Sequence, residues 1–180
     1  MESAPFVQAL ILSAFPFLLA FAGVSDLITM TISNRISILL VATFLILALA
    51  LGLPLEKIAW HVAAGALVLA IGFAMFAVGW IGGGDAKLAA AISLWFGIEL
   101  TFEFAVVSAF FGGLLTLFIV LARQRHLAIF VHKIEWLERF LSGRKGVPYG
   151  IALSAGALML YPQTIWVASL VQSVGSGFQP

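Results

Sequence analysis

The sequence contains no cysteine, and only 9% of its 180 residues are charged. Without cysteine the chain has no disulfide framework, no thiol nucleophile and no Cys-ligated metal site. The three histidines, His61, His126 and His132, form no i, i+4 pair, so the His-Glu-x-x-His helix of a zinc peptidase is excluded as well. We therefore expect neither a metal nor a cofactor.

Apolar residues are abundant, at 63% of the chain, and the mean hydropathy is +1.16. Soluble domains have nearer half apolar residues and lack long unbroken apolar runs. The composition predicts an all-α polytopic membrane protein that is surrounded by the lipid bilayer. We expect no nucleic-acid partner.

Six apolar runs follow one another along the chain: 4–25, 36–53, 58–81, 88–98, 104–122 and 149–174. About 20 apolar residues span a bilayer, so we predict six transmembrane helices. The fourth run is short and is bracketed by Lys87 and Glu99, so it crosses only if 84–104 is helical and the flanking charges snorkel. Pro162-Gln163-Thr164 in the last run predicts a kinked helix.

We find no internal repeat and no long linker, and residues 1–180 therefore form a single predicted membrane domain. The basic residues give its topology. With six crossings, one side carries Arg35, Lys87, Arg123, Arg125, Lys133, Arg139, Arg144 and Lys145, and the other carries only Lys57. By the positive-inside rule the first side is cytoplasmic and both termini lie outside. If 88–98 fails to cross, the long basic loop moves to the face of Lys57.

The loop 123–145 has its own pattern. Apolar residues recur in it at spacings of three and four: Leu127, Phe130, Ile134, Leu137 and Leu141. This spacing predicts an interfacial amphipathic helix in the long cytoplasmic loop, with Trp136 at the level of the lipid headgroups. Such a helix could anchor the protein beside anionic lipid, or it could dock a substrate.

Two aspartates, Asp26 and Asp85, stand at the edges of apolar segments, where ionisable groups are costly and often functional. Two secure crossings separate them, so both lie on the same face in either topology. Two converging carboxyl groups tend to share one proton; one then acts as a base on water while the other polarises a carbonyl, which is the aspartic-protease solution to amide hydrolysis. No other residue offers a comparable nucleophile or base.

Structural interpretations of the same residues stay open at this point. Asp85 could cap a helix, and Asp26 could be a solvated residue just past the end of the first helix. Gly82, Gly83 and Gly84 could form a simple turn, or they could allow close approach of a substrate backbone. They do not form a phosphate loop, because the Gly-Lys-Ser/Thr ending is missing.

Two non-enzymatic functions compete with hydrolysis. A small proton- or ion-coupled carrier would use Asp26 and Asp85 as a relay, but carriers usually show an internal inverted repeat and we see none. A non-catalytic assembly partner of a secretion machine would pair the same aspartates with basic residues.

Three segments together resemble type IV prepilin peptidases, which are GxGD intramembrane aspartic peptidases. Segment 25–35 reads SDLITMTISNR and resembles their first motif, an aspartate followed by Ile-Pro-Asn-Arg. Segment 82–88 reads GGGDAKL and resembles Gly-x-Gly-Asp-x-Lys-Leu, while 147–152, VPYGIA, resembles the Pro-Tyr/Phe-Gly element that opens the last helix. The match is closest to the short forms that serve Flp-type, tight-adherence pili.

The resemblance implies a peptidase of the bacterial inner membrane that removes the short basic leader of a prepilin at the cytoplasmic face, cutting before the hydrophobic helix. It implies Asp26 and Asp85 as the catalytic pair. Supporting or substrate-binding positions are implied for Gly82, Gly83, Gly84, Lys87, Asn34, Arg35, Pro148, Tyr149 and Gly150. The expected partner is a Flp-type prepilin or pseudopilin, and the oligomeric state stays open.

Two departures from the family pattern stand out. Ser33 replaces the usual proline, which predicts a looser turn after Asp26. Larger members also carry an amino-terminal domain with paired cysteines that methylates the new pilin terminus, so we expect no methyl transfer here.

Three of the supporting positions also have structural interpretations. Arg35 could be an interfacial anchor, and Asn34 could cap the second helix. Lys87 is close enough in sequence to Asp85 to influence its charge, although side chains two apart on a helix point away from each other.

Overall fold

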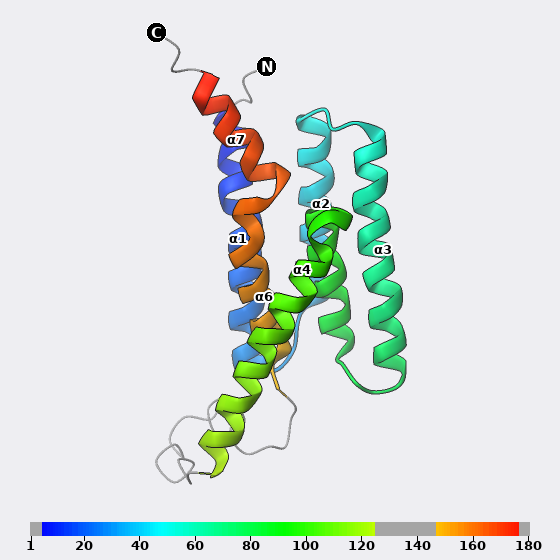
Figure 1. Ribbon diagram of the computed structural model, residues 1–180, viewed down its shortest axis with the longest axis vertical. Coiled ribbons are helices and arrows are strands. Elements are labelled where there is room, and N and C mark those ends of the chain that lie inside the picture. The colour runs from blue at the N-terminus through cyan, green and yellow to red at the C-terminus, as the bar shows by residue number, and fades with distance from the viewer. Residues whose placement is uncertain (1–4, 125–146, 177–180) are drawn as a thin grey trace.

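The computed structural model describes residues 5–124 and 147–176. Its elements are α1 (Pro5–Thr29), α2 (Asn34–Ala50), α3 (Leu55–Ala77), α4 (Gly83–Gln124), α6 (Tyr149–Leu160), the short 3₁₀ helix η2 (Tyr161–Gln163) and α7 (Ile165–Ser176). Every element in these ranges is helical, which confirms the predicted all-α class. The chain enters and leaves at the same end of the molecule (Figure 1). The predicted amphipathic helix of 123–145 falls almost wholly outside the described residues.

Four helical stretches are long and apolar enough to cross a membrane: Gln8–Thr29, Leu55–Ala77, Gly83–Ala122 and Tyr149–Val171. The apolar helix α2 is shorter, at 17 residues. The protein is therefore a multi-pass membrane protein. Six separate transmembrane helices are not confirmed, because the fourth and fifth predicted runs both lie within α4.

Helix α4 reverses direction at Gly97. This residue has φ 67° and ψ −176°, a conformation that interrupts the helix and that only glycine adopts readily. Figure 1 shows a first arm, residues 83–96, that meets a second arm, residues 98–124, at this turn. The condition that 84–104 be helical throughout is therefore not met. At 1.5 Å per residue the first arm is about 21 Å long, well short of the ~30 Å hydrocarbon core.

Side chains from distant helices satisfy the backbone at this reversal. The Leu94 carbonyl accepts a hydrogen bond from His61 Nδ1 at 2.8 Å, and the Trp95 carbonyl accepts one from Trp166 Nε1 at 2.8 Å. Rings of His61, Trp95 and Trp166 pack around Phe44 with centroid distances of 5.5–6.3 Å. Broken helices are tolerated at membrane depth only where protein groups replace the lost bonds in this way.

Small residues bring α3 close to the first arm of α4. A Cβ added to Gly72 would lie 2.9 Å from the Ala86 Cβ, and one added to Gly65 would lie 3.2 Å from the Ala90 carbonyl oxygen. Packing through small residues is typical of helices in membranes, where close backbone approach replaces the hydrophobic effect. This contact fixes the start of α4 against α3.

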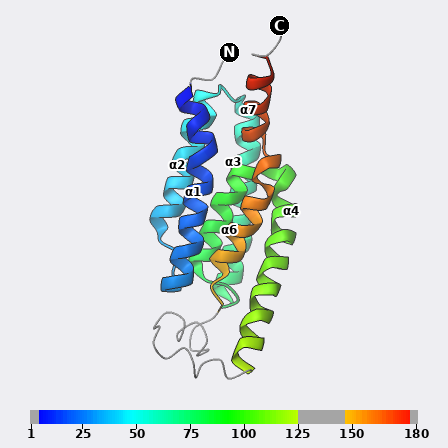
Figure 2. The same cartoon turned by 90° about the vertical axis from the view of Figure 1, so that its left-hand side faces the viewer.

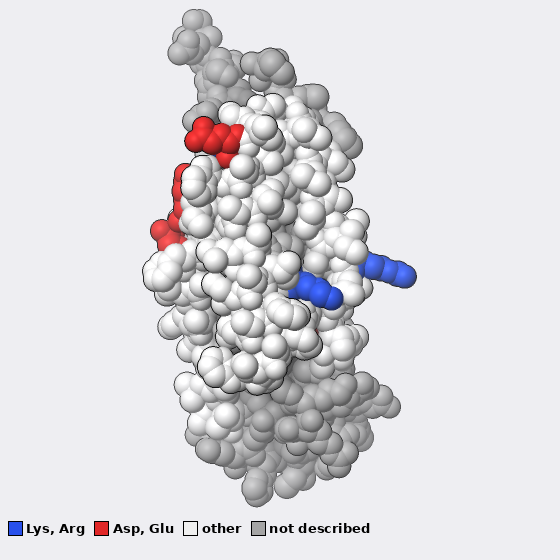
Figure 3. All heavy atoms as spheres, turned by 90° about the vertical axis from the view of Figure 1, so that its right-hand side faces the viewer, with Lys and Arg blue, Asp and Glu red and all other residues white. Residues whose placement is uncertain are grey.

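Helix α6 contacts both α1 and α4, and Figure 2 shows it between α1 and the second arm of α4. Pro162 lies in the 3₁₀ turn between α6 and α7, so the predicted kink is confirmed. Most of the face in Figure 3 is uncharged, as expected of a surface that meets lipid, with acidic side chains along one edge and two basic side chains near mid-height. The fold thus brings the end of α1, the start of α4 and the start of α6 to one end of the bundle.

Candidate active site

Asp26 lies inside α1, one turn before its end, and its side chain is 4% exposed. The interpretation of this residue as solvated and past the helix end is therefore wrong. Its Oδ2 atom accepts a 2.8 Å hydrogen bond from the backbone N–H of Gly150 in the first turn of α6. A Cβ on Gly150 would lie 2.8 Å from the same oxygen, so only glycine leaves room for this contact. The Pro-Tyr-Gly segment thus positions Asp26.

Asp85 is the third residue of α4 and is half-buried. Its Oδ2 atom accepts a 3.2 Å hydrogen bond from the N–H of Gly82, the residue before the helix. This arrangement resembles a capping box, in which the third helical residue reaches back to the first free amide. Asp85 therefore does not occupy the N-cap position itself, but its charge lies at the positive end of the helix dipole.

The two carboxyl groups come close enough to interact electrostatically. Tyr149 lies near Asp85, and the two residues line one cavity. Among the described residues, the hydrogen bonds above are the only ones that either carboxylate makes, so each keeps an oxygen for another partner. The three predicted motifs therefore contribute to a single cluster.

Ile32 joins these motifs, and sequence reasoning gave it no role. Added Cβ atoms on Gly84 and Gly150 would meet Ile32 at 3.2 Å and 2.8 Å. The two glycines allow one isoleucine to pack between the starts of α4 and α6. The available signal was that Ile32 lies within the first motif, between the aspartate and Ser33.

The glycine run serves packing and hydrogen bonding together. Gly82 donates to Asp85, Gly84 contacts Ile32, and Gly83 faces the Phe76 ring, where a Cβ would lie 3.4 Å from the ring. The side of Gly83 where a side chain would stand therefore faces Phe76 and not the carboxylates, and Gly83 supports the turn after α3.

Lys87 and Asn34 connect the first two motifs. Lys87 Nζ donates a 2.9 Å hydrogen bond to Asn34 Oδ1. Ser33 caps α2, since its hydroxyl accepts from the Arg35 N–H at 3.3 Å, so the assignment of Asn34 as the cap is wrong. The Arg35 side chain is exposed and makes no polar contact with the described residues.

Pro148 precedes α6 with φ −70° and is buried, so its ring sets the direction from which Tyr149 enters. The Tyr149 ring packs on the backbone of Gly112 in the second arm of α4, at a spot that any Cβ on Gly112 would overlap. Gly112 was not predicted; its signal is the Gly112-Gly113 pair inside an apolar run. Within 5–124 and 147–176, no group of three potential ligands could hold a metal ion.

Comparisons with known proteins agree with the motif resemblance. A family model described as the type IV leader peptidase family matches residues 13–117, more than half of the chain. This match includes the segments of Asp26 and Asp85, while the α6 segment lies beyond it. Neither a search of curated proteins nor a search of solved structures gave a significant match.

Proposed function

Because the chain belongs to the type IV leader peptidase family, we propose that it is an intramembrane aspartic endopeptidase that removes the leader of a prepilin. The proposal includes a Flp-type substrate, an active site at the cytoplasmic face of the bacterial inner membrane, and residues 1–180 acting as one peptidase domain. It includes no methyl transfer, since the sequence has none of the cysteines which that activity uses in larger relatives.

The observation that carries this proposal is the convergence of Asp26 and Asp85. They come from helices separated by two others in sequence, they interact electrostatically, and a single backbone amide anchors each one. A pair of neighbouring carboxylates resists double ionisation and holds one proton between them. The pair therefore has one group ready to accept a proton and one ready to donate.

Hydrolysis proceeds in two steps, addition of water and collapse of the diol, each with two proton transfers. The ionised carboxylate takes a proton from water as the water oxygen bonds to the scissile carbonyl carbon, while the protonated carboxyl donates to the carbonyl oxygen. The resulting diol collapses as the C–N bond breaks: the leaving nitrogen takes up the proton that the first carboxylate accepted, and one diol hydroxyl returns a proton to the second carboxylate. Water is consumed, one carboxylic acid and one amine are released, and the dyad regains its single proton.

The surrounding residues hold this pair in place. The Gly150 N–H fixes Asp26, and the Gly82 N–H fixes Asp85. Lys87 contacts Asn34 rather than Asp85, which supports a role in joining the start of α4 to the start of α2. Arg35 is exposed at the same end and fits an interfacial anchor.

The test replaces each acid by its amide. Asparagine keeps the size of aspartate but cannot exchange the proton, so Asp26→Asn and Asp85→Asn should each lower prepilin cleavage by at least about 10³-fold. The double variant should be no worse than either single one, because groups that act as a unit are not additive. Glu56→Gln, at an exposed acid in the first turn of α3, is the matched control and should cleave normally.

Near wild-type cleavage by either folded asparagine variant would refute the aspartic mechanism. A carrier or an assembly partner predicts instead that the purified wild-type protein cleaves no prepilin at all.

A further inference from the structure

The first arm of α4 separates two hollows. On one side, a groove of ≈ 820 Å³ runs between α2, α3 and the face of the arm that carries Lys87 and Ala90. On the other side, a cavity of ≈ 210 Å³ lies between α3, both arms of α4 and α6. Asp85 and Tyr149 line the smaller cavity, and neither lines the larger groove. The smaller cavity is therefore the one that adjoins the candidate reacting groups.

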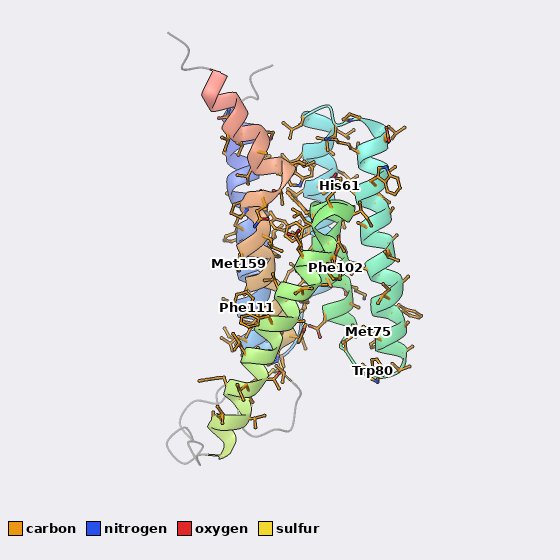
Figure 4. The ribbon with its side chains drawn as sticks, viewed as in Figure 1. His61, Met75, Trp80, Phe102, Phe111 and Met159 are labelled. Carbon is orange, nitrogen blue, oxygen red and sulfur yellow. The ribbon has the colours of Figure 1, made fainter. Side chains whose placement is uncertain are left out.

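Apart from that end, the walls of the smaller cavity are mainly apolar. Ile71 and Met75 come from α3, Ala89 from the first arm and Ala105 from the second. In Figure 4, Met75 lies on α3 between His61, toward the start of the helix, and Trp80, just after its end. A peptide that reached Asp85 could thus place an apolar side chain into this space without leaving a charge unpaired.

The size of the cavity suits one large side chain. An apolar cavity of about 150 Å³ binds benzene, so ≈ 210 Å³ accommodates an aromatic or branched aliphatic group. Small residues leave this space unfilled, since Gly72, Ala86 and Ala105 all line it.

We propose that this cavity binds the substrate side chain immediately after the scissile bond and selects for an apolar one. The inference rests on the proposed function, in which cleavage separates a basic leader from a hydrophobic helix. A basic side chain before the bond would be poorly solvated in an apolar cavity, whereas the first residue of the hydrophobic helix fits it. With that side chain inside, the preceding peptide bond lies at the cavity wall formed by Asp85.

The test narrows the cavity and measures two substrates. Ala105→Leu adds carbon atoms to a residue that is exposed on the second arm, so the core packing is unaffected. One purified preparation is given two prepilins that differ only in having leucine or alanine after the scissile bond. The ratio of their kcat/KM values should fall by about tenfold or more against leucine, since steric rejection in an apolar pocket is worth roughly 10–200-fold.

Two further variants complete the design. Ala89→Leu narrows the cavity from the first arm and should shift the ratio in the same direction. Ala66→Leu is the matched control, because Ala66 is also an exposed helical alanine but lines the larger groove. It should leave the ratio at the wild-type value. Because the ratio is measured within one preparation, a partly unfolded sample does not change it.

An unchanged ratio in both cavity variants would overturn the inference, and a shift in Ala66→Leu alone would move the site to the larger groove. The proposed function has a separate readout in the same assay. If the wild-type protein cleaves and Asp85→Asn does not, the function holds whatever the ratio shows. If the wild-type protein cleaves neither prepilin, the function fails, and the side-chain assignment fails with it.

Discussion

The first arm of α4 begins and ends at glycine, yet its two ends are built for different purposes. At the start, the Gly82 N–H binds a carboxylate that keeps an oxygen for another partner. At the reversal around Gly97, ring N–H groups of His61 and Trp166 bind the freed carbonyls, and aromatic rings enclose them. The carboxylate at the start of the arm can still accept hydrogen bonds, whereas the freed carbonyls at the reversal are already paired.

This difference separates stability from activity along a single helix. Fully paired polar groups inside aromatic packing contribute to the folded state, because leaving either partner alone costs about 1–3 kcal/mol. Partly satisfied carboxylates contribute to chemistry, since water and substrate can still bind to them. Substitutions at the reversal should therefore change the free energy of unfolding, whereas substitutions around the carboxylates should change turnover.

After the two aspartates, the largest expected effect is at Gly112. A Cβ at this position overlaps the Tyr149 ring, so Gly112→Ala should displace Tyr149 and the adjacent Gly150 amide that holds Asp26. Misplacement of a catalytic group by about 1 Å can reduce the rate by ~100-fold, and we expect a loss of this order in kcat/KM for prepilin cleavage. The fraction of folded protein, measured by gel filtration in detergent, should stay close to wild type.

Gly113→Ala is the control for this variant. It lies on the same arm one residue later, and an added Cβ there meets nothing within 4 Å. Cleavage should be unchanged. Equal losses of cleavage in both variants would show that any added side chain in this part of α4 is harmful, and that displacement of Tyr149 is not the cause.

The second effect concerns Gly97. Alanine at φ 67° and ψ −176° is strained by about 1–3 kcal/mol, and its Cβ would lie 3.1 Å from the His61 ring. Gly97→Ala should lower the midpoint of thermal unfolding while the molecules that remain folded cleave normally. Gly52→Ala provides the comparison, because Gly52 has a similar φ of 62° but open space around it. A Gly97 variant that is no less stable than the Gly52 variant would contradict the role assigned to the His61 contact.

The smallest effect is expected at Ser33, where relatives of this family usually have proline. Ser33 has φ −68° and ψ 133°, which a proline ring accommodates. Ser33→Pro loses one long hydrogen bond to the Arg35 N–H but gains rigidity in the unfolded chain. Unfolding free energy and cleavage rate should therefore change little, by about 0.5 kcal/mol or less and within twofold. A large loss would show that the serine hydroxyl is needed for the turn.

Much of the site could be predicted from the sequence. The two apolar runs between Asp26 and Asp85 predicted that both lie on one face, and the glycine run and Pro-Tyr-Gly element marked the other contributors. The contacts themselves could not be predicted. That Gly150 donates to Asp26 depends on how α6 packs against α1, across 124 positions of sequence.

The position of the reversal at Gly97 was not predicted, because the fourth and fifth apolar runs were expected to be separate helices with their break after residue 98. Gly97 lies inside the apolar run 88–98, and one glycine in a helix is ordinarily tolerated. The groups that stabilise the break, His61 and Trp166, lie 33 and 71 positions from their partners. No local pattern links them, so the tight turn at Gly97 could not be predicted.

The short first arm has a consequence for where the chain can reverse. An arm of about 21 Å is shorter than a ~30 Å hydrocarbon layer, and most of its residues from Ala86 to Phe96 are buried against protein. A reversal inside a bilayer is possible where neighbouring helices, and not lipid, surround the broken backbone. The length of this arm is therefore set by packing within the bundle and not by the thickness of the membrane.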